Sequence, residues 1–475
     1  MQKNNLLVSN FKIALILLLG IIMWNIAPPE GLDTTSWHLF IIFVSTIIGI
    51  ILNPLPIGAI TTIGALFLVL TKTLTLKQTL SGFSDEIVWL IVFAFFISGG
   101  FINTGLGARI AYSLIAKFGH STLGLAYSLV FTDLALSPSI PSVTARGGGI
   151  LFPIASSLSK VFSNNGKNAA SSSRNGGFFM AICMQSNVIT SAMFLTAMAA
   201  NPVIVKLALM SNIDISWFDW ALAALVPGMI SLILMPLFMY YYLYPPSIRT
   251  STEAPKMAQK KLIEMGTISN KELVMIGIFF ILIFSWIFGK KLFGINASGT
   301  ALLGYVLLLI TRLITFEETV KTAPAWNTFI WFGHLGMMSS FLAKMGIMSW
   351  IELYLKTAFI GYSPLLLILC LSLIYFYMHY LFASATAHVT VFFPTFLLLF
   401  TNVGIDGKIA ALILGFLSIL SSGLTHFGLA SAPIFFGAGY IGIKTWFRIG
   451  LLSSILYLII WAIAGSGWWK VIGLW

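Results

Sequence analysis

The sequence predicts an all-α polytopic membrane protein of about 11 transmembrane helices, with two re-entrant hairpins and an inverted repeat. Three observations predict this fold class: the composition, a series of apolar segments long enough to cross a bilayer, and residues that recur about 240 positions apart. Of the 475 residues, 58% are hydrophobic and 8% are charged, and the mean hydropathy is +0.97. Soluble domains carry about 25% charged residues. Lipid must solvate much of this chain, because no soluble core could hide so much apolar surface.

The apolar segments have lengths close to the roughly 20 residues that a helix needs to cross a bilayer. The first follows a basic region with Lys3 and Lys12. We expect a retained span, since no small-x-small cleavage site precedes a soluble domain, although a cleaved signal peptide fits the same pattern. The predicted spans are 11–27, 36–53, 55–71, 86–104, 176–200, 217–244, 272–289, 295–311, 325–343, 407–440 and 446–464.

Two apolar stretches, residues 121–160 and 362–402, are interrupted in their middles by Pro, Gly, Ser and Thr. Each is predicted to enter the membrane, turn and return as a re-entrant hairpin. Non-helical backbone is tolerated at membrane depth only where it is buried in protein or lines a wet cavity. The turns of the two hairpins are therefore candidate functional sites.

The longest polar stretch runs from Pro245 to Glu272 and is rich in basic residues, so the positive-inside rule predicts a cytoplasmic linker. The net charge of +12 comes from basic residues scattered through short connections, which is typical of this rule and not of a nucleic-acid site. The predicted units are 1–35, an N-terminal span and connection; 36–244, a first inverted-repeat unit; 245–271, the linker; and 272–475, a second unit.

The two halves share residues at a nearly constant spacing. With an odd number of spans in each half, the two units would be inverted relative to each other. Inverted repeats are typical of secondary transporters, whose site lies at the repeat interface near the bilayer midplane. The matches are Thr71 with Thr311 and Thr75 with Thr315, 240 apart; Trp89 with Trp331, Ser142 with Ser384 and Thr144 with Thr386, 242 apart; and TSAMFL (190–195) with ASAPIF (430–435), 240 apart.

The repeat pairs SVTAR (142–146) with SATAH (384–388) at the hairpin turns. Pro138, Pro141 and the glycines 147–149 break the first hairpin, and freed backbone N–H groups and helix N-termini attract anions. Ser142, Thr144, Ser384 and Thr386 add hydroxyl donors. These hydroxyls could instead satisfy only local backbone. Their occurrence in both turns favours a binding site.

Arg146 and its counterpart His388 are predicted to compensate the charge of a bound anion. An arginine inside a membrane costs about 2.5–3.5 kcal/mol, so it should face a cavity or a partner. In the alternative interpretations Arg146 extends to the membrane surface or pairs with Asp133. The segments after the hairpins, 184–202 and 421–433, are predicted to be unwound, although small-residue helix packing is the alternative. Their candidate cavity-lining residues are Asn187, Thr190, Ser191, Thr425, His426 and Ser431.

These turns, together with FLTAMAANP (194–202) and LTHFGLASAP (424–433), resemble the divalent anion:sodium symporter family. The nearest branch is that of 2-oxoglutarate/malate translocators and citrate/succinate exchangers. The family's turns usually read Ser-Asn-Thr, and the resemblance implies substrate binding by the two turn triplets. It also implies a homodimer and an elevator-type movement. The triplets here are Ser142, Val143, Thr144 and Ser384, Ala385, Thr386, and Val143 and Ala385 lack the amide that would help to hold sodium.

The resulting hypothesis is a sodium-independent, obligatory exchanger of C4/C5 dicarboxylates such as malate, succinate, fumarate and 2-oxoglutarate in the cytoplasmic membrane. In it, Arg146 and His388 replace the charge of sodium. The alternatives are a sodium- or proton-coupled di- or tricarboxylate (citrate) symporter, an anion channel and a membrane enzyme. An enzyme is disfavoured because the 14 acidic residues lie mostly in connections and show no metal-ligand spacing. No cofactor and no nucleic-acid partner are expected. The expected partners are a dicarboxylate substrate, membrane lipid and a second copy of the chain in a homodimer.

Overall fold

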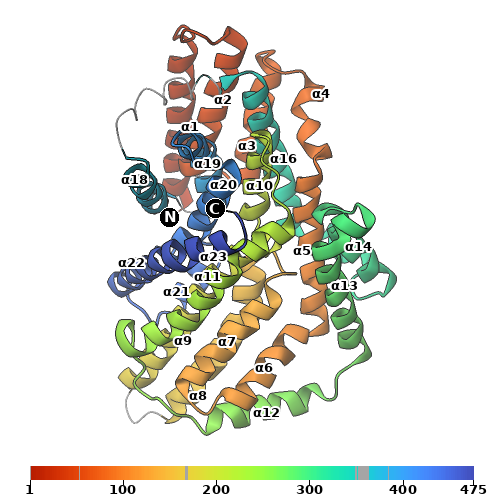
Figure 1. The fold of residues 1–475 in the computed structure, drawn as a ribbon, viewed down its shortest axis with the longest axis vertical. Helices are drawn as coiled ribbons and strands as arrows, with labels where there is room; N and C mark the ends of the chain where they lie inside the picture. The colour runs from red at the N-terminus through yellow and green to blue at the C-terminus, as the bar shows by residue number, and fades with distance from the viewer. Residues whose placement is uncertain are drawn as a thin grey trace.

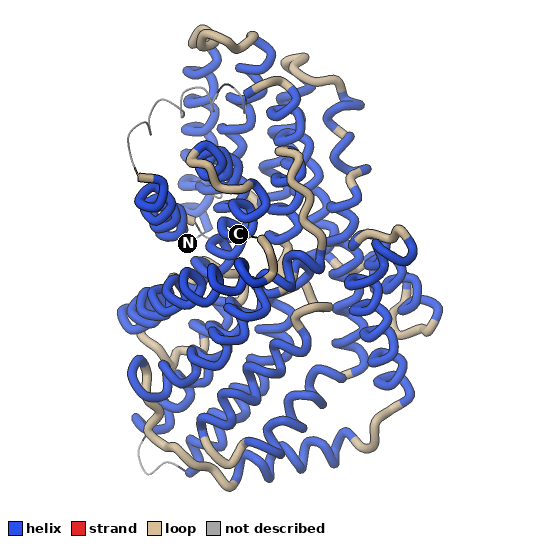
Figure 2. The backbone as a smooth tube through the Cα atoms, viewed as in Figure 1, coloured by secondary structure: helices blue, strands red, loops and turns tan. Residues whose placement is uncertain are grey.

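The computed structural model describes residues 2–52, 54–165, 169–347, 350, 363–382 and 384–474. Within these residues all regular elements are helices (Figure 2). Six helices are long and apolar enough to cross a bilayer, and shorter apolar helices accompany them. The all-α polytopic class is therefore confirmed. The six are Thr34–Leu52, Glu86–Thr104, Trp217–Leu243, Asn270–Phe293, Ala385–Asn402 and Ile443–Val471.

The first helices lie together at one end of the molecule (Figure 1). Helix α5 begins where the Asp85 carboxylate accepts the N–H of Ile87, and it ends at Gly105, whose φ of 72° lies in the left-handed region that glycine adopts without a steric penalty. The elements in order are α1 (Gln2–Trp24), α2 (Thr34–Leu52), α3 (Ile57–Leu70), α4 (Leu76–Thr79), η1 (Ser81–Ser84) and α5 (Glu86–Thr104).

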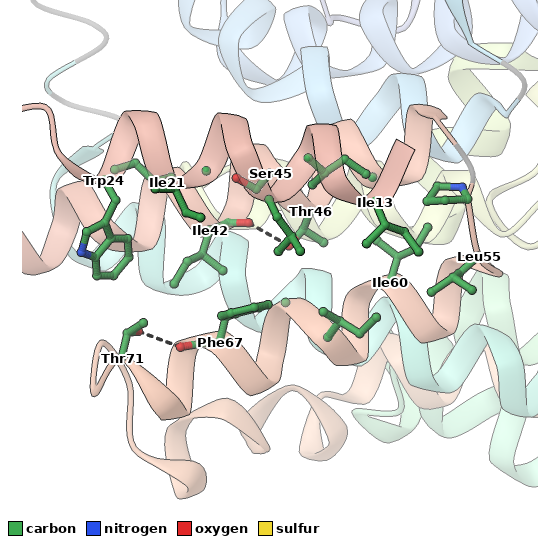
Figure 3. Close-up of a pocket in the computed structure, with 18 residues that line it drawn as sticks. Ile13, Ile21, Trp24, Ile42, Ser45, Thr46, Leu55, Ile60, Phe67 and Thr71 are labelled. Carbon is green, nitrogen blue, oxygen red and sulfur yellow. Dashed lines mark hydrogen bonds between the residues drawn. The ribbon is translucent and has the colours of Figure 1, made fainter. Parts of the chain in front are cut away.

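An apolar groove of about 250 Å³ lies between α1, α2 and α3 (Figure 3). Ile21, Ile42 and Phe67 are among the side chains that line it. Such a lining suits contact with lipid tails.

The first predicted hairpin is present as a helix, an irregular turn over residues 137–142 and a second helical segment that begins at Val143. Its re-entry into a membrane stays a prediction. The elements around it are α6 (Leu106–Phe118), α7 (Thr122–Leu136), the π-helical η2 (Ala145–Leu151), α8 (Phe152–Asn165), α9 (Ala169–Met193), η3 (Leu195–Ala197), α10 (Ala200–Met210), α11 (Trp217–Phe238) and η4 (Met239–Leu243).

The prediction of an unwound segment over 184–202 is too wide. Helix α9 continues to Met193, since no Pro or Gly interrupts residues 178–193. The break covers residues 194–199, where Phe194 and Met198 are extended around the single turn of η3. We call this segment the α9–α10 break.

The predicted polar linker contains a helix, α12 (Glu253–Met265), which lies along α6 at the opposite end of the molecule from α1 (Figure 1). Arg109 of α6 donates to the Glu272 carboxylate at 2.5 Å and to the Gly266 carbonyl at 2.9 Å. The linker is therefore held against α6 and is more ordered than its composition indicated.

The second half repeats the arrangement around a second hairpin, with Phe382 and Ser384 between η5 and α19 at its turn. The predicted span 407–440 is interrupted, and the prediction of an unwound segment over 421–433 is confirmed: α20 ends at Leu420, and backbone with only the short turn of η6, which we call the α20–α21 break, follows to Ser431. The elements are α13 (Asn270–Phe293), α14 (Ala297–Ile310), α15 (Phe316–Val320), α16 (Ala323–Lys344), α18 (Pro364–Tyr377), η5 (Met378–Leu381), α19 (Ala385–Asn402), α20 (Gly407–Leu420), η6 (Ser421–Gly423), α21 (Ala432–Gly437), α22 (Ile443–Ile460), η7 (Trp461–Gly465) and α23 (Ser466–Val471).

The local backbone supports the repeat in the sequence. Helices α3 and α14 each have 14 residues, and each is followed by a basic residue in the left-handed region, Lys72 at φ 58° and Arg312 at φ 56°. Thr75 and Thr315 then each form a capping box that starts the next short helix. The same unusual features thus recur 240 residues apart, while the boundaries of the two units stay a prediction.

Candidate functional site

The two hairpin turns meet at one cavity of about 420 Å³. All six turn residues singled out from the sequence line it, although the two triplets lie 242 residues apart. A volume of this size lies within the range of small-molecule sites. The residues are Ser142, Val143 and Thr144 from the first hairpin and Ser384, Ala385 and Thr386 from the second.

One face of α16 forms another wall of the same cavity. Pro324, Thr328, Trp331 and Leu335 line it, and their spacing of four, three and four residues places them on one side of a helix. We call these four residues the α16 face. Side chains of α2, α3 and α5 also contribute to the apolar part of the lining: Ile47, Ile50, Ile57 and Phe95.

The polar groups of the turns are donors without protein partners. The side chains of Thr144, Ser384 and Thr386 make no hydrogen bond within the described residues, and the Ser142 hydroxyl accepts the N–H of Ala145 at 3.1 Å, which leaves its own proton free. No acidic or basic side chain is among the residues that line this cavity. The site therefore suits a ligand that accepts hydrogen bonds.

The first turn of α19 opens into this cavity. Its N-cap residue Ser384 makes no capping hydrogen bond, and its next three residues, 385–387, all line the cavity. The N–H groups of a first helical turn have no acceptor inside the helix. Together with the positive end of the dipole of this 18-residue helix, they favour an anion.

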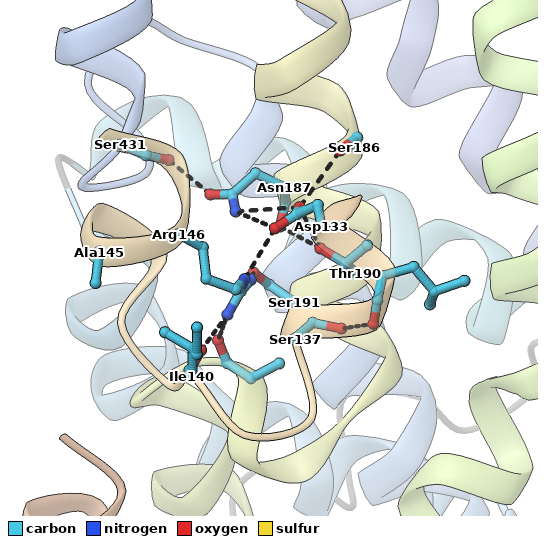
Figure 4. A network of polar contacts seen from close by, with 12 residues as sticks. Asp133, Ser137, Ile140, Ala145, Arg146, Ser186, Asn187, Thr190, Ser191 and Ser431 are labelled. Atoms are coloured by element: carbon cyan, nitrogen blue, oxygen red, sulfur yellow. Dashed lines mark hydrogen bonds and ion pairs between the residues drawn. The ribbon is translucent and has the colours of Figure 1, made fainter. Parts of the chain in front are cut away.

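Arg146 does not lie in the cavity lining, which corrects its predicted role as a charge-compensating residue. Its side chain is completely buried, and Nε donates to Asp133 Oδ1 at 3.0 Å (Figure 4). Nη2 donates to Ser191 Oγ at 2.8 Å, and Nη1 donates to the carbonyls of Ala197 and Ile140. Asp133 already balances the charge of Arg146, so the alternative interpretation made from the sequence is the right one.

Asp133 is the centre of a buried polar network (Figure 4). Its carboxylate accepts from Thr190 Oγ1 at 2.7 Å and from Asn187 Nδ2 at 3.2 Å. Asn187 Oδ1 in turn accepts from Ser431 Oγ at 2.8 Å, which links α9 to the α20–α21 break. Four of the predicted cavity-lining residues are thus outside the cavity lining, because their side chains belong to this network: Asn187 and Thr190 donate to Asp133, Ser191 accepts from Arg146, and Ser431 donates to Asn187.

His388 is also outside the cavity lining. It is completely buried, and Nε2 lies 3.0 Å from the Tyr375 carbonyl. Aromatic rings surround it, with the centroid of Tyr375 at 4.6 Å and that of Phe382 at 5.6 Å. No carboxylate contacts it among the described residues, so a charge on His388 would be buried and unpaired, which is costly. This corrects its predicted charge-compensating role.

Thr425 and His426, the remaining predicted cavity-lining residues, are not among the lining residues either. Thr425 Oγ1 accepts the N–H of Phe427 at 3.4 Å, and the His426 ring packs on Phe436 with centroids 4.7 Å apart. Both side chains therefore stabilise the α20–α21 break.

The α16 face was not predicted from the sequence. Trp331 is predicted only as a match to Trp89, and Thr328 lies inside a predicted apolar span. The signal was present, since Thr328 and Trp331 are three residues apart and so share a helix face. It could not be separated from ordinary packing until the turns were placed opposite them.

The profile of the family described as the sodium:sulfate symporter transmembrane region matches residues 7–475. The chain belongs to this family. It is 47% identical over 457 residues, 96% of this chain and 95% of the relative, to Bacillus subtilis YflS, which carries the name of a malate transporter. It is 46% identical over 459 residues to the chloroplastic dicarboxylate transporter 1 of Arabidopsis thaliana (96% and 82%), and 36% identical over 478 residues to the inner membrane protein YbhI of Escherichia coli (98% and 98%).

Two solved structures share the fold of this chain. The Neisseria gonorrhoeae efflux pump MtrF superposes with a TM-score of 0.56 at 16% identity, covering 94% of this chain and 96% of its own. The Alcanivorax borkumensis transporter YdaH gives 0.53 at 12% identity, with 99% and 98% covered. The resemblance to the divalent anion:sodium symporters is confirmed by the family match, and the chain is a multi-pass membrane transporter and not an enzyme.

Proposed function

We propose that this protein exchanges C4/C5 dicarboxylates across the cytoplasmic membrane without sodium. The observation that carries the proposal is the cavity between the two turns, which is lined by hydroxyl donors and a helix N-terminus and by no acidic side chain. The names of the relatives point to the same substrates, since YflS is named for malate and the Arabidopsis protein for dicarboxylates.

The turns suit carboxylates because an ionised carboxylate accepts hydrogen bonds and cannot donate them, while the turn hydroxyls and the N–H groups of α19 have protons to donate. In the proposed complex, Ser142 and Thr144 bind from one side and Ser384 and Thr386 from the other, beside the first turn of α19. Hydrogen bonds to an ionised acceptor are roughly twice as strong as neutral ones. The apolar part of the lining would contact the carbon chain of the substrate.

Two features support independence from sodium. Val143 and Ala385 supply no side-chain oxygen at the middle of either turn. At the first turn, the carbonyls of Ile140 and Ala197 are already bridged by the Arg146 guanidinium. Arginine stays protonated in proteins. The Arg146 guanidinium is therefore a fixed cation that joins the first turn to the α9–α10 break. Without it, a mobile cation such as sodium would be needed to bridge the carbonyl oxygens of Ile140 and Ala197.

Obligatory exchange follows from the unpaired donors. The resemblance implies that both hairpins move together past the rest of the protein, and we include this elevator movement and a homodimer in the proposal. If the cavity were empty during this movement, the unpaired hydroxyl donors of the turns would pass apolar side chains such as Ile50 and Phe95. Each unsatisfied buried donor costs about 1–3 kcal/mol. A bound dicarboxylate satisfies them, so the loaded form crosses far more readily than the empty form.

A sodium-coupled symporter is the second candidate, because the description of the family names sodium. The two are separated in proteoliposomes by following labelled malate in buffers with and without sodium. Exchange predicts uptake into malate-loaded vesicles at least about tenfold faster than into empty ones, a difference of about 1.4 kcal/mol in barrier, with no effect of sodium. Net uptake into empty vesicles that requires a sodium gradient would overturn the exchange proposal and favour the symporter.

The side of the linker is part of the proposal as well. We place residues 245–271 on the cytoplasmic side because the segment is rich in Lys and Arg. A single cysteine introduced at the exposed Lys260 should be labelled by an impermeant maleimide in inside-out but not in right-side-out vesicles. The reverse labelling pattern would place the linker outside.

A further inference from the structure

The cavity between the turns has two sides that differ in width. On one side, a second cavity of about 270 Å³ shares Phe95, Ser142 and Pro324 with it. On the other side, a space of about 10 Å³ shares Leu335 and Thr390 with it. A space of that size holds one water molecule at most. In this structure a dicarboxylate can therefore reach the turns through the first side and not through the second.

The wide side faces the polar linker. The exposed Ile102 and Asn103 line the second cavity, near the end of α5 that leads into α6, and the linker helix α12 packs against α6. Helix α5 is long and apolar enough to cross a bilayer, so Asp85 at its other end lies on the opposite side of the membrane. We call the two sides the linker side and the far side.

A lysine closes the far side. Lys206 of α10 lines the narrow space and is only 7% exposed. Its ammonium group donates to the Asp85 carboxylate, which also begins α5. The lysine stem passes Gly336 of α16, where a Cβ atom would lie 3.3 Å from Lys206 Cε. The missing side chain at position 336 thus leaves room for Lys206 to reach its partner.

The ion pair joins two parts of the molecule that the proposed movement separates. Helix α10 follows the α9–α10 break, which Arg146 ties to the first hairpin, and it packs against α19 of the second hairpin. It therefore moves with the hairpins. Asp85 belongs to α5, which packs against α14 and α16 outside both hairpins. Movement of α10 past α5 and α16 has to break the contact between Lys206 and Asp85.

The repeat shows that this ion pair has no equivalent on the linker side. The residue 242 positions after Asp85 is Asn327, which carries no charge. When the movement closes the linker side, the matched position therefore offers no carboxylate for a second ion pair of this kind. A contact that exists in only one of two states shifts their equilibrium toward that state.

We propose that the Lys206–Asp85 ion pair is a latch that holds the protein open toward the linker side and breaks each time the hairpins move. This inference rests on the proposed function, because it requires the elevator movement. It assigns the far-side closure to one pair of side chains, and its removal should increase the population of the state that opens on the far side.

The test measures how fast a maleimide labels single cysteines in purified protein without Cys183 and Cys370. Ser339→Cys reports on the far side, since Ser339 is 4% exposed and lines the narrow space. Ser98→Cys reports on the linker-side cavity. In Lys206→Met, labelling at position 339 should be about tenfold faster, as expected for one lost bond to a charged group. Labelling at position 98 should be no faster, because general loosening would raise both rates.

A second pair of variants tests whether the two residues act together. Asp85→Asn keeps an oxygen to cap α5, and its combination with Lys206→Met leaves neither charge unpaired. If the ion pair acts as a unit, the double variant should accelerate labelling at position 339 as much as each single variant does, and not by the product of the two effects. The double variant also carries the test if either single variant fails to fold.

Lys290→Met is the matched control. Lys290 of α13 pairs with Asp214, after the end of α10, at 2.8 Å, and both side chains are more than 60% exposed. Exposed ion pairs contribute little, so labelling at position 339 should stay within about twofold.

Unchanged labelling at position 339 in the folded double variant, or equal acceleration at positions 98 and 339, would overturn the latch. The labelling needs no transport. Failure of the unaltered protein to exchange malate would instead refute the proposed function, so the two failures are distinct.

Discussion

In each of the two hairpins a side chain after the turn contacts the helix before the turn, but the two contacts differ in charge. Arg146 and His388 lie 242 residues apart, and so do the residues they contact across their hairpins, Asp133 and Tyr375. The first contact is a buried ion pair at 3.0 Å, and the second is a neutral contact between His388 Nε2 and the Tyr375 carbonyl, also at 3.0 Å. The two contacts join matched positions over the same distance, but only the contact in the first hairpin is an ion pair.

This difference indicates that the residues at these matched positions, Arg146 and His388, each have a local structural role before any role toward substrate. Arg146 fixes the first turn to the α9–α10 break through Ile140 and Ala197. In the second half, the neighbouring His379 makes the corresponding link, with Nε2 3.2 Å from the Gly428 carbonyl in the α20–α21 break. Both turns are thus tied to the broken helix beside them, but only the first by a charge.

The largest effect is expected from breaking the ion pair. Asp133→Asn leaves Arg146 buried without a counter-charge, which typically costs 3–5 kcal/mol. We expect a strongly lowered midpoint of thermal unfolding in detergent and loss of malate exchange. Tyr375→Phe in the other half should change the unfolding midpoint much less, because it removes only the hydroxyl contact with Ser418 at 2.7 Å.

The double variant Asp133→Leu with Arg146→Met separates folding from positioning. Replacing a buried ion pair by apolar side chains of similar volume is often neutral for stability. We therefore expect the unfolding midpoint to recover while exchange stays low, since nothing then joins Ile140 to Ala197. Recovery of exchange together with stability would show that the guanidinium bridge is dispensable for transport.

A second, smaller effect concerns His388. Since no carboxylate among the described residues contacts it, exchange should not depend on its protonation, and the unaltered protein and His388→Gln should share one pH profile between about pH 6 and 8. The free energy of unfolding should fall by about 1 kcal/mol for one weakened hydrogen bond. A pH dependence of exchange that disappears in His388→Gln would restore a titrating role for this residue.

These expectations also show how far the sequence alone could reach. The turns could be predicted because Pro, Gly, Ser and Thr interrupt apolar segments at matched positions, and the cavity they share followed from the repeat. The partner of Arg146 could not be decided, because Asp133 is 13 residues away across the turn and pairs with it only if α7 and η2 pack closely. The α16 face could not be recognised from the sequence. Residues such as Thr328 and Trp331 are common in apolar spans, and only the structure shows that they line the same cavity as the hairpin turns.

A third effect distinguishes the serines of the two turns. The Ser142 hydroxyl also accepts the N–H of Ala145, whereas the Ser384 hydroxyl has no hydrogen-bond partner among the described residues. Ser384→Ala should therefore raise the KM for malate exchange about tenfold with no change in unfolding midpoint. Ser142→Ala should raise KM similarly and also lower stability by about 1 kcal/mol, because it removes a capping contact. Equal unfolding midpoints for the two variants would contradict this asymmetry.

The smallest expected effect is the sharpest test of the comparison between the hairpins. An asparagine at the middle of a turn would add an amide oxygen, a group that suits a hard cation. At the first turn, Val143→Asn should leave exchange independent of sodium, because Arg146 already bridges the nearby carbonyls of Ile140 and Ala197. At the second turn no buried cation is paired in this way within the described residues, so Ala385→Asn should make exchange respond to sodium by about twofold or more. Sodium dependence in Val143→Asn, with none in Ala385→Asn, would reverse the assignment of the fixed cation to the first hairpin.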